Sequence, residues 1–191
     1  MIGKNPSSLH FCIVRKILLF TIFALFVLNF PLVRVLSISN SNARSERVFS
    51  RAALARGFVI SYTHSVNKGR VRDFYFPLES GELELSMTEF VSYGAGIPES
   101  SETEGSRFRV TKNGYAIENL HRVVPRLLMA VGVVAEHSIA IADASEPLNT
   151  DFGKEVFLKD FFKPQTSVIF EVRKVSLLQY FIVGVSHRLE R

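Results

Sequence analysis

The chain has 191 residues, which is enough for one domain of ordinary size and an appendage. Its net charge of +5 would suit a nucleic-acid binder. However, Lys4, Arg15, Lys16 and Arg34 all precede Ser37, in a stretch without any acid. Removing these four from the 23 bases leaves 19 against 18 acids, and the remaining bases are scattered. The sequence therefore argues against nucleic acid as a partner.

The only cysteine, Cys12, lies before the long apolar run near the N-terminus. No disulfide can brace the rest of the chain, so packing of its apolar side chains has to stabilise it. The residues before Cys12, Leu9-His10-Phe11, are not the small residues that precede a lipidated cysteine. A lipid anchor is not expected.

The N-terminal region contains an uncharged run of seventeen residues, Ile17 to Val33. As a helix it would be about 26 Å long, close to the roughly 30 Å hydrocarbon core of a bilayer. Arg15 and Lys16 precede the run and only Arg34 follows closely, an asymmetry that keeps the N-terminus inside. The pattern predicts a single-pass anchor in the cytoplasmic (inner) membrane.

This topology divides the chain into four parts. Residues 1–16 would be cytoplasmic, 17–36 a transmembrane signal anchor, 37–56 a linker and short helix, and 57–191 a periplasmic or extracellular β-domain. A buried core helix is the alternative for the apolar run. Cleavage is the alternative to retention, because Ser41-Asn42-Ala43 offers the small residues of a signal-peptidase site. Its distance from the run favours a retained anchor.

Beyond Gly57 the apolar residues recur with period two, which is typical of β-strands. The short helix before it is expected at Ser45 to Arg56. Pro125 predicts irregular structure around it, and Ser176 to Val185 is too short to span and suits a final strand or a surface helix. Strands are expected at residues 57–64, 71–78, 82–90, 107–111, 115–119, 137–142 and 166–174, with a helical turn within 152–162. The fold class is mostly β: a compact antiparallel β-sandwich or barrel-like domain behind an N-terminal transmembrane helix.

No motif specifies a reaction or a cofactor: the chain lacks a phosphate-binding glycine loop, HExxH, CxxC and GxSxG. The first candidate site is His64 with Ser65, at the end of a strand. Such a histidine is a possible base or ligand donor, and a residue that fixes the next turn is the structural alternative.

The second candidate is Glu89, in phase with the apolar face of its strand. A carboxylate there must be paired or have a raised pKa, unless a β-bulge turns it outward. The residues after it allow close approach of a ligand to the backbone. They are Ser92, Tyr93, Gly94 and Gly96.

Arg122 and Arg126 flank Pro125 and form the third candidate, since two guanidinium groups suit a carboxylate. Solvated surface charge is the alternative. A metal site would have to combine residues of separate strands without a close ligand pair, which argues against one. Its donors would be His64, His121, His137 and Glu89.

Three segments together resemble a known family. YTHSVNKGRVRDFY, MTEFVSYGAGIPE and NGYAIENLHRVVPRLLMAVG are similar to a bacterial and archaeal domain of unknown function, number 1850. The resemblance runs from about Gly57 to Lys174, with Asn67 where the family commonly has Glu. It implies small membrane-anchored proteins associated with TRAP-type (TAXI) solute transporters, whose partner would be the permease or its solute-binding protein.

Two functions are expected in consequence. The first is a membrane-anchored accessory protein of such a transporter, without enzymatic activity. The second is a stand-alone module that binds or senses a small carboxylate solute through His64, Glu89 and Tyr93. A metal-dependent hydrolase is a third and weaker hypothesis.

Overall fold

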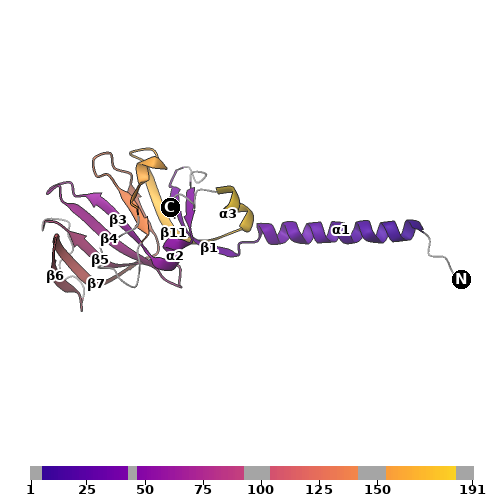
Figure 1. The fold of residues 1–191 in the computed structure, drawn as a ribbon, viewed down its shortest axis with the longest axis horizontal. Coiled ribbons are helices and arrows are strands. Elements are labelled where there is room, and N and C mark those ends of the chain that lie inside the picture. The colour runs from indigo at the N-terminus through magenta and orange to yellow at the C-terminus, as the bar shows by residue number, and fades with distance from the viewer. Residues whose placement is uncertain (1–5, 43–46, 93–103, 142–153, 184–191) are drawn as a thin grey trace.

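The computed structural model describes residues 6–42, 47–92, 104–141 and 154–183. A β-domain occupies one end of the molecule, and helix α1 (Pro6–Asn29) projects from it (Figure 1). The remaining elements are β1 (Val33–Asn40), β2 (Arg47–Ser50), α2 (Ala52–Arg56), β3 (Phe58–Thr63), β4 (Arg70–Pro77), β5 (Leu83–Phe90), β6 (Arg107–Thr111), β7 (Gly114–Val124), β8 (Leu127–Ala130), β9 (Ser138–Ile141), β10 (Val156–Phe157), the 3-10 turn η1 (Leu158–Asp160), β11 (Ser167–Val175) and α3 (Leu177–Val183).

The strands form two antiparallel sheets, so the expected mostly β fold is confirmed. The larger sheet has the order β10-β9-β3-β4-β5-β7-β6, and the smaller has β2-β1-β11-β8. Pro125 falls between β7 and β8, where the chain passes from the larger sheet to the smaller one. Proline lacks the N–H that a continuous strand would donate to a ladder, so it suits this change of sheet.

The main core lies between the two sheets. The Phe58 ring of the larger sheet stacks on Tyr75 at 5.5 Å between centroids and on Phe170 of the smaller sheet at 5.8 Å. Leu36 and Ile38 of β1 belong to the same buried cluster. We call the face of the larger sheet that carries this cluster the inner face, and the opposite face the outer face.

A β-bulge in β5 changes which residues share a face. Tyr75 pairs with Leu85, whereas Phe74 pairs with Met87, so Ser86 is the extra residue. Leu85 therefore lies on the inner face, and Met87 packs on the outer face beside Phe74. The alternating Leu83, Leu85 and Met87 therefore do not share one face, although the apolar pattern around Glu89 would place them together.

The apolar N-terminal run is not a single helix. Helix α1 ends at Asn29, and Val33 already begins β1, so the expected anchor boundary at residue 36 is too late. Ser37 to Asn40, expected in a linker, are buried in β1 between β2 and β11. None of the helices in the described part of the chain is both long and apolar enough to qualify as a membrane span.

The short helix before Gly57 starts later than predicted. The Ser50 hydroxyl, just before the helix, accepts a hydrogen bond from the Ala53 N–H in the first turn at 3.0 Å. Gly57 ends the helix with φ of 87°, where a side chain would meet the Tyr75 carbonyl. At the other end of the chain, Leu177–Val183 form the surface helix α3, near the domain end of α1 (Figure 1).

Candidate functional site

His64 lies where β3 ends and fixes the turn that follows. Its ring Nδ1 accepts a hydrogen bond from the Val66 N–H at 3.3 Å, and its backbone pairs with Gly69 at 2.9 Å. Ser65 is exposed beside it. Of the cavities described below, none is lined by either residue. These contacts support the structural alternative for His64.

Asn67, the departure from the family pattern, also has a structural role in this turn. Its side-chain amide donates to the Ser92 carbonyl at 2.9 Å, and its Oδ1 accepts from the Gly69 N–H at 3.0 Å. The turn after β3 is thereby tied to the end of β5. Ser92 takes part through its backbone, whereas the predicted Tyr93, Gly94 and Gly96 lie outside the described residues.

Glu89 lies on the outer face, because the bulge at Ser86 shifts the phase of β5. It is paired across the strands with Arg72 and lines a small outer cavity of about 170 Å³ with Arg70 and Arg72. Burial raises the pKa of the Glu89 carboxyl, although the charges of Arg72 and Arg109 oppose the shift. Glu89 and His64 are therefore not brought together in one pocket of the described chain.

A different carboxylate, Asp73, lies at the centre of the inner face. It occupies the middle of β4, and its Oδ1 accepts a hydrogen bond from the Thr88 hydroxyl at 2.9 Å. The Tyr62 hydroxyl of the neighbouring strand also hydrogen-bonds to it. Burial raises its pKa to about 6, although Thr88, Tyr62 and the charge of Arg122 oppose the shift.

Two cavities are lined by this carboxylate, with volumes of about 290 and 220 Å³. They share the residues Tyr62, Asp73, Tyr75 and Leu127. The larger is completed by Leu85, Thr88, Arg122 and Val124. The smaller is completed by Ile60, Met129 and His137. We call the pair the inter-sheet cavity; it combines apolar walls with a few convergent polar groups, as small-molecule sites do.

The polar groups of the inter-sheet cavity differ in charge. Burial and the nearby Asp73 raise the pKa of Tyr62, and the same two causes raise that of Tyr75, so both stay neutral phenols that can donate. Burial lowers the pKa of His137, which the charge of Arg70 reinforces, and its ring packs 5.7 Å from that of Tyr62. Asp73 and Arg122 are thus the two charged groups among the lining residues near neutral pH.

Arg122 and Arg126 are separated by the break at Pro125. Arg122 lies near the end of β7 and lines the inter-sheet cavity. An arginine that binds a carboxylate in this cavity would have to do so. Arg126 is exposed and does not line it. Of the two predicted arginines, only Arg122 lines the described cavities, so the structure does not bring the pair together in them.

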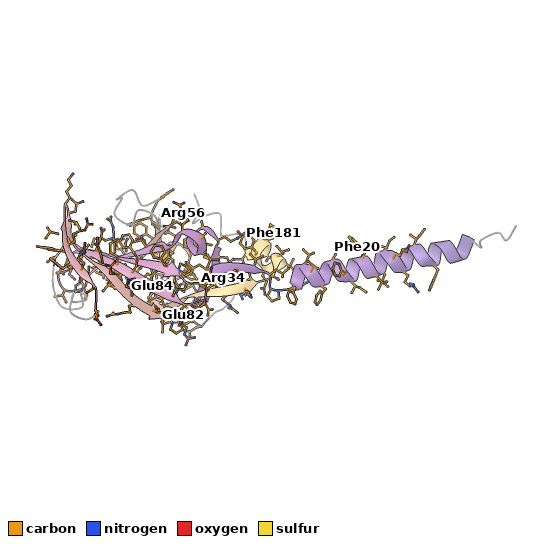
Figure 2. The ribbon with its side chains drawn as sticks, turned by 90° about the horizontal axis from the view of Figure 1, so that it is seen from below. Phe20, Arg34, Arg56, Glu82, Glu84 and Phe181 are labelled. Carbon is orange, nitrogen blue, oxygen red and sulfur yellow. The ribbon has the colours of Figure 1, made fainter. Side chains whose placement is uncertain are left out.

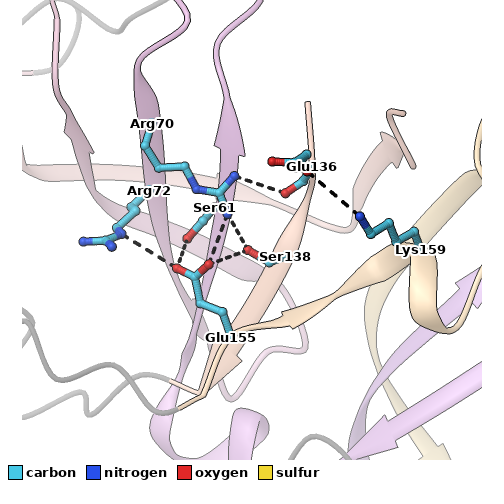
Figure 3. A network of polar contacts seen from close by, with 7 residues as sticks. All are labelled: Ser61, Arg70, Arg72, Glu136, Ser138, Glu155 and Lys159. Atoms are coloured by element: carbon cyan, nitrogen blue, oxygen red, sulfur yellow. Dashed lines mark hydrogen bonds and ion pairs between the residues drawn. The ribbon is translucent and has the colours of Figure 1, made fainter. Parts of the chain in front are cut away.

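The outer face carries a second polar cluster around Glu155 (Figure 3). Its carboxylate accepts hydrogen bonds from Ser61 at 3.1 Å, Ser138 at 2.9 Å and Arg70 at 3.1 Å, and Arg72 lies 3.9 Å away. Burial alone would raise the pKa of Glu155, but the Ser138 hydrogen bond and the Arg70 charge outweigh it and lower the pKa. The cluster joins β3, β4 and β9 to the residue before β10, which is a structural task.

The histidines proposed as metal donors are dispersed. His121 contacts Glu84, His64 fixes its turn, and His137 accepts a hydrogen bond from the Gly132 N–H at 3.1 Å. Within the described ranges, no three His, Cys, Asp or Glu side chains are grouped to hold a metal ion.

Sequence reasoning missed Asp73, although the signal was present. Asp73 falls in phase with Val71 and Tyr75 of the same strand, as Glu89 was expected to do on β5. The rule that singled out Glu89 applies equally to VRDFYF, and here no bulge lies between the carboxylate and Val71 to change its face.

Residues 58–148 match the family model described as a domain of unknown function (DUF1850). This match confirms the resemblance and covers β3 to β9, and so every strand of the larger sheet except β10. No curated protein and no solved structure matches the chain.

Proposed function

We propose that the chain, whose residues 58–148 match the DUF1850 family model, is a membrane-anchored accessory protein of a TRAP-type (TAXI) solute transporter. Helix α1 would hold it in the cytoplasmic membrane with the N-terminus inside, and the β-domain would work outside. The permease or its solute-binding protein would be the partner.

The observation that carries the anchor is the exposed apolar surface of α1. Four successive residues, Ile17 to Phe20, are each more than half exposed, with fractions of 59, 57, 58 and 72%. Since successive helical residues are about 100° apart, these four cover every side of the helix. Figure 2 shows α1, with Phe20 labelled, extending beyond the β-domain. A surface of this kind needs an apolar environment.

Carbonate extraction of membranes tests the anchor. We expect the full chain to stay in the membrane pellet. The double variant Phe20→Lys, Phe23→Lys should be released, because each lysine at the centre of a span costs about 2.5–3.5 kcal/mol. Val66→Lys is the control, since Val66 is as exposed as Phe20 at 72% but lies in the β-domain. Release of the unaltered chain would contradict the anchor.

Mild crosslinking in intact cells tests the partner. The full chain should capture the large permease subunit or the solute-binding protein, and the double lysine variant should lose the permease. The family resemblance supports this expectation, and the anchor supplies the location. If neither transporter component is captured, the accessory role is wrong.

A second candidate function is favoured by the inter-sheet cavity: binding or sensing of a small polar solute. A buried acid with a raised pKa, beside phenols and one guanidinium, is unusual in a region with a purely structural task. A thermal-shift screen of small carboxylates, amines and amino acids tests it with the full chain in detergent. A saturable rise in melting temperature is expected.

Matched variants locate the binding. The rise should disappear in Asp73→Asn and persist in Glu89→Gln, because Glu89 lines the outer cavity instead. The reverse pattern would move the site to Glu89, as the sequence suggested. No saturable rise with any compound would exclude this function.

A further inference from the structure

We infer that the inter-sheet cavity binds a zwitterion, a small amino acid with an apolar side chain, whose ammonium group pairs with Asp73 and whose carboxylate pairs with Arg122. The inference rests on the proposed solute-binding role of this cavity and names its ligand class.

The charges of the cavity are the first reason. Asp73 on β4 and Arg122 on β7 line the same 290 Å³ space and interact electrostatically. Both strands pair with β5, so their backbones lie about 10 Å apart across the sheet, and the two residues are also offset along the strands, because Asp73 pairs with Thr88 and Arg122 with Leu85. Both side chains reach into the space between, where a ligand with two opposite charges can meet each of them.

A ligand with one charge fits less well. A simple carboxylate that pairs with Arg122 would bring a second negative charge toward Asp73 in a partly buried space. A simple amine that pairs with Asp73 would face the guanidinium of Arg122. A zwitterion meets neither repulsion, because each of its charges lies toward its opposite.

The neutral lining defines the rest of the ligand. The Tyr62 and Tyr75 side chains flank Asp73, and an aromatic face attracts an ammonium group next to a carboxylate. Leu85, Val124 and Leu127 line the remainder of the same space and suit an apolar side chain. The volume is at the lower end of the range for small-molecule sites, which favours a compact ligand.

The titration of Asp73 adds a signature. The groups that face it are Tyr62 on β3, Tyr75 on β4, Thr88 on β5 and Arg122 on β7, with His137 in the adjoining cavity. With a pKa raised to about 6, Asp73 is ionised at pH 7.5 and largely protonated near pH 5. Amine recognition should therefore strengthen as the pH rises through 6, whereas recognition of a carboxylate alone should weaken.

Three matched probes test the inference by calorimetry with the full chain in detergent. L-valine has both charges, 3-methylbutanoate lacks the amine, and isobutylamine lacks the carboxylate. We expect valine to bind about 10- to 100-fold more tightly than either fragment, the loss typical of one charged hydrogen-bonded contact. Its affinity should be higher at pH 7.5 than near pH 5.

The variants assign the two contacts. Arg122→Gln should reduce the affinity for valine to that of isobutylamine, and Asp73→Asn should reduce it to that of 3-methylbutanoate. Arg126→Gln should change nothing, because Arg126 does not line the inter-sheet cavity. If 3-methylbutanoate binds as tightly as valine, or better near pH 5, the zwitterion is wrong and the solute-binding function stands. If all three probes fail while another compound shifts the melting temperature, the ligand class is again wrong. If nothing binds, both proposals fall.

Discussion

Two acids on opposite faces of the seven-stranded sheet, Glu155 and Asp73, have pKa values that are shifted in opposite directions. On the outer face, Glu155 accepts three hydrogen bonds and lies beside Arg70, which lowers its pKa despite burial. On the inner face, Asp73 accepts hydrogen bonds from two neutral hydroxyls and feels the charge of Arg122, and its pKa rises to about 6. Asp73 is the more deeply buried of the two acids, and its partners oppose the effect of burial less than Arg70 and the serine hydroxyls do for Glu155.

The two acids also differ in what surrounds them. The partners of Glu155 lie on β3, β4 and β9, so its hydrogen bonds and ion pair link three strands of the sheet. Asp73 instead faces a cavity, and the neighbouring side chains stabilise its negative charge only in part. An acid that costs stability at neutral pH is the better candidate for a ligand contact.

The largest expected effect concerns the core that closes the inner face. Phe170→Ala should lower the free energy of unfolding by about 3–5 kcal/mol, because its fully buried ring stacks on Phe58. Denaturant unfolding of the full chain in detergent measures it. Phe108→Ala is the control: this ring is 43% exposed, and we expect a loss of less than about 1 kcal/mol. Equal losses would show that the inner face is not the principal core.

The next effect is a gain in stability. The folded-state pKa of Asp73 is about 6 and the unfolded value about 3.9, so its contribution is fully present below pH 3.9 and is lost as the pH rises through 6. Asp73→Asn should remove this loss and raise the free energy of unfolding at pH 7.5 by up to about 2–3 kcal/mol.

Denaturant midpoints at several pH values measure the change. The unaltered chain should lose stability between about pH 4 and pH 7 through Asp73, and the variant should lose less. A variant that is less stable than the unaltered chain at pH 7.5 would mean that the bonds from Thr88 and Tyr62 outweigh the burial of the charge.

Much of this inner face was open to prediction from the sequence. The period-two patterns of β3 and β4 and the stop at Gly57 were predicted, because local alternation and a glycine with positive φ depend on near neighbours alone. β1 was missed because its first residue, Val33, belongs to the apolar run, and Val35 and Leu36 follow after a single charged residue. A pattern of hydropathy does not show where a helix gives way to a strand.

The candidate site was harder to predict, for a different reason. The bulge at Ser86 turns Met87 and Glu89 to the outer face, and one extra residue of this kind leaves no local mark in the sequence. Arg122 reaches the cavity because β7 extends to Val124, whereas the sequence predicted that the strand ends at Asn119. That Asp73 and Arg122 line one cavity depends on strand order, which no local pattern contains.

A smaller effect is expected on the outer face. Glu155→Ala should lower the free energy of unfolding by about 1–2 kcal/mol at pH 7, because Arg70, Ser61 and Ser138 lose their acceptor. Its folded-state pKa is lowered, so the stability it contributes is present above the unfolded value of about 4.3 and is lost as the pH falls through the folded value.

Unfolding midpoints at neutral and acid pH measure this effect. Glu136→Ala is the matched control, since that side chain is 54% exposed and lies 4.0 Å from Lys159, and a change of less than about 0.5 kcal/mol is expected. If the two variants lose the same amount of stability, Glu155 is an ordinary surface acid, and the proposed contrast between Glu155 and Asp73 is wrong.

The smallest effect tests the inner face by its charge alone. Arg122 lowers the pKa of Asp73, so Arg122→Gln should move the pH at which Asp73 titrates further upward, with little change in stability at pH 5, where Asp73 is already largely protonated. The carboxyl carbon resonance of Asp73, followed by NMR against pH, measures the shift, and Arg126→Gln should leave it unchanged. A titration that stays in place would show that Arg122 does not sense Asp73 across the cavity. Since a zwitterion that bridges the two groups requires that coupling, an upward shift also shows that both charges act on the same space.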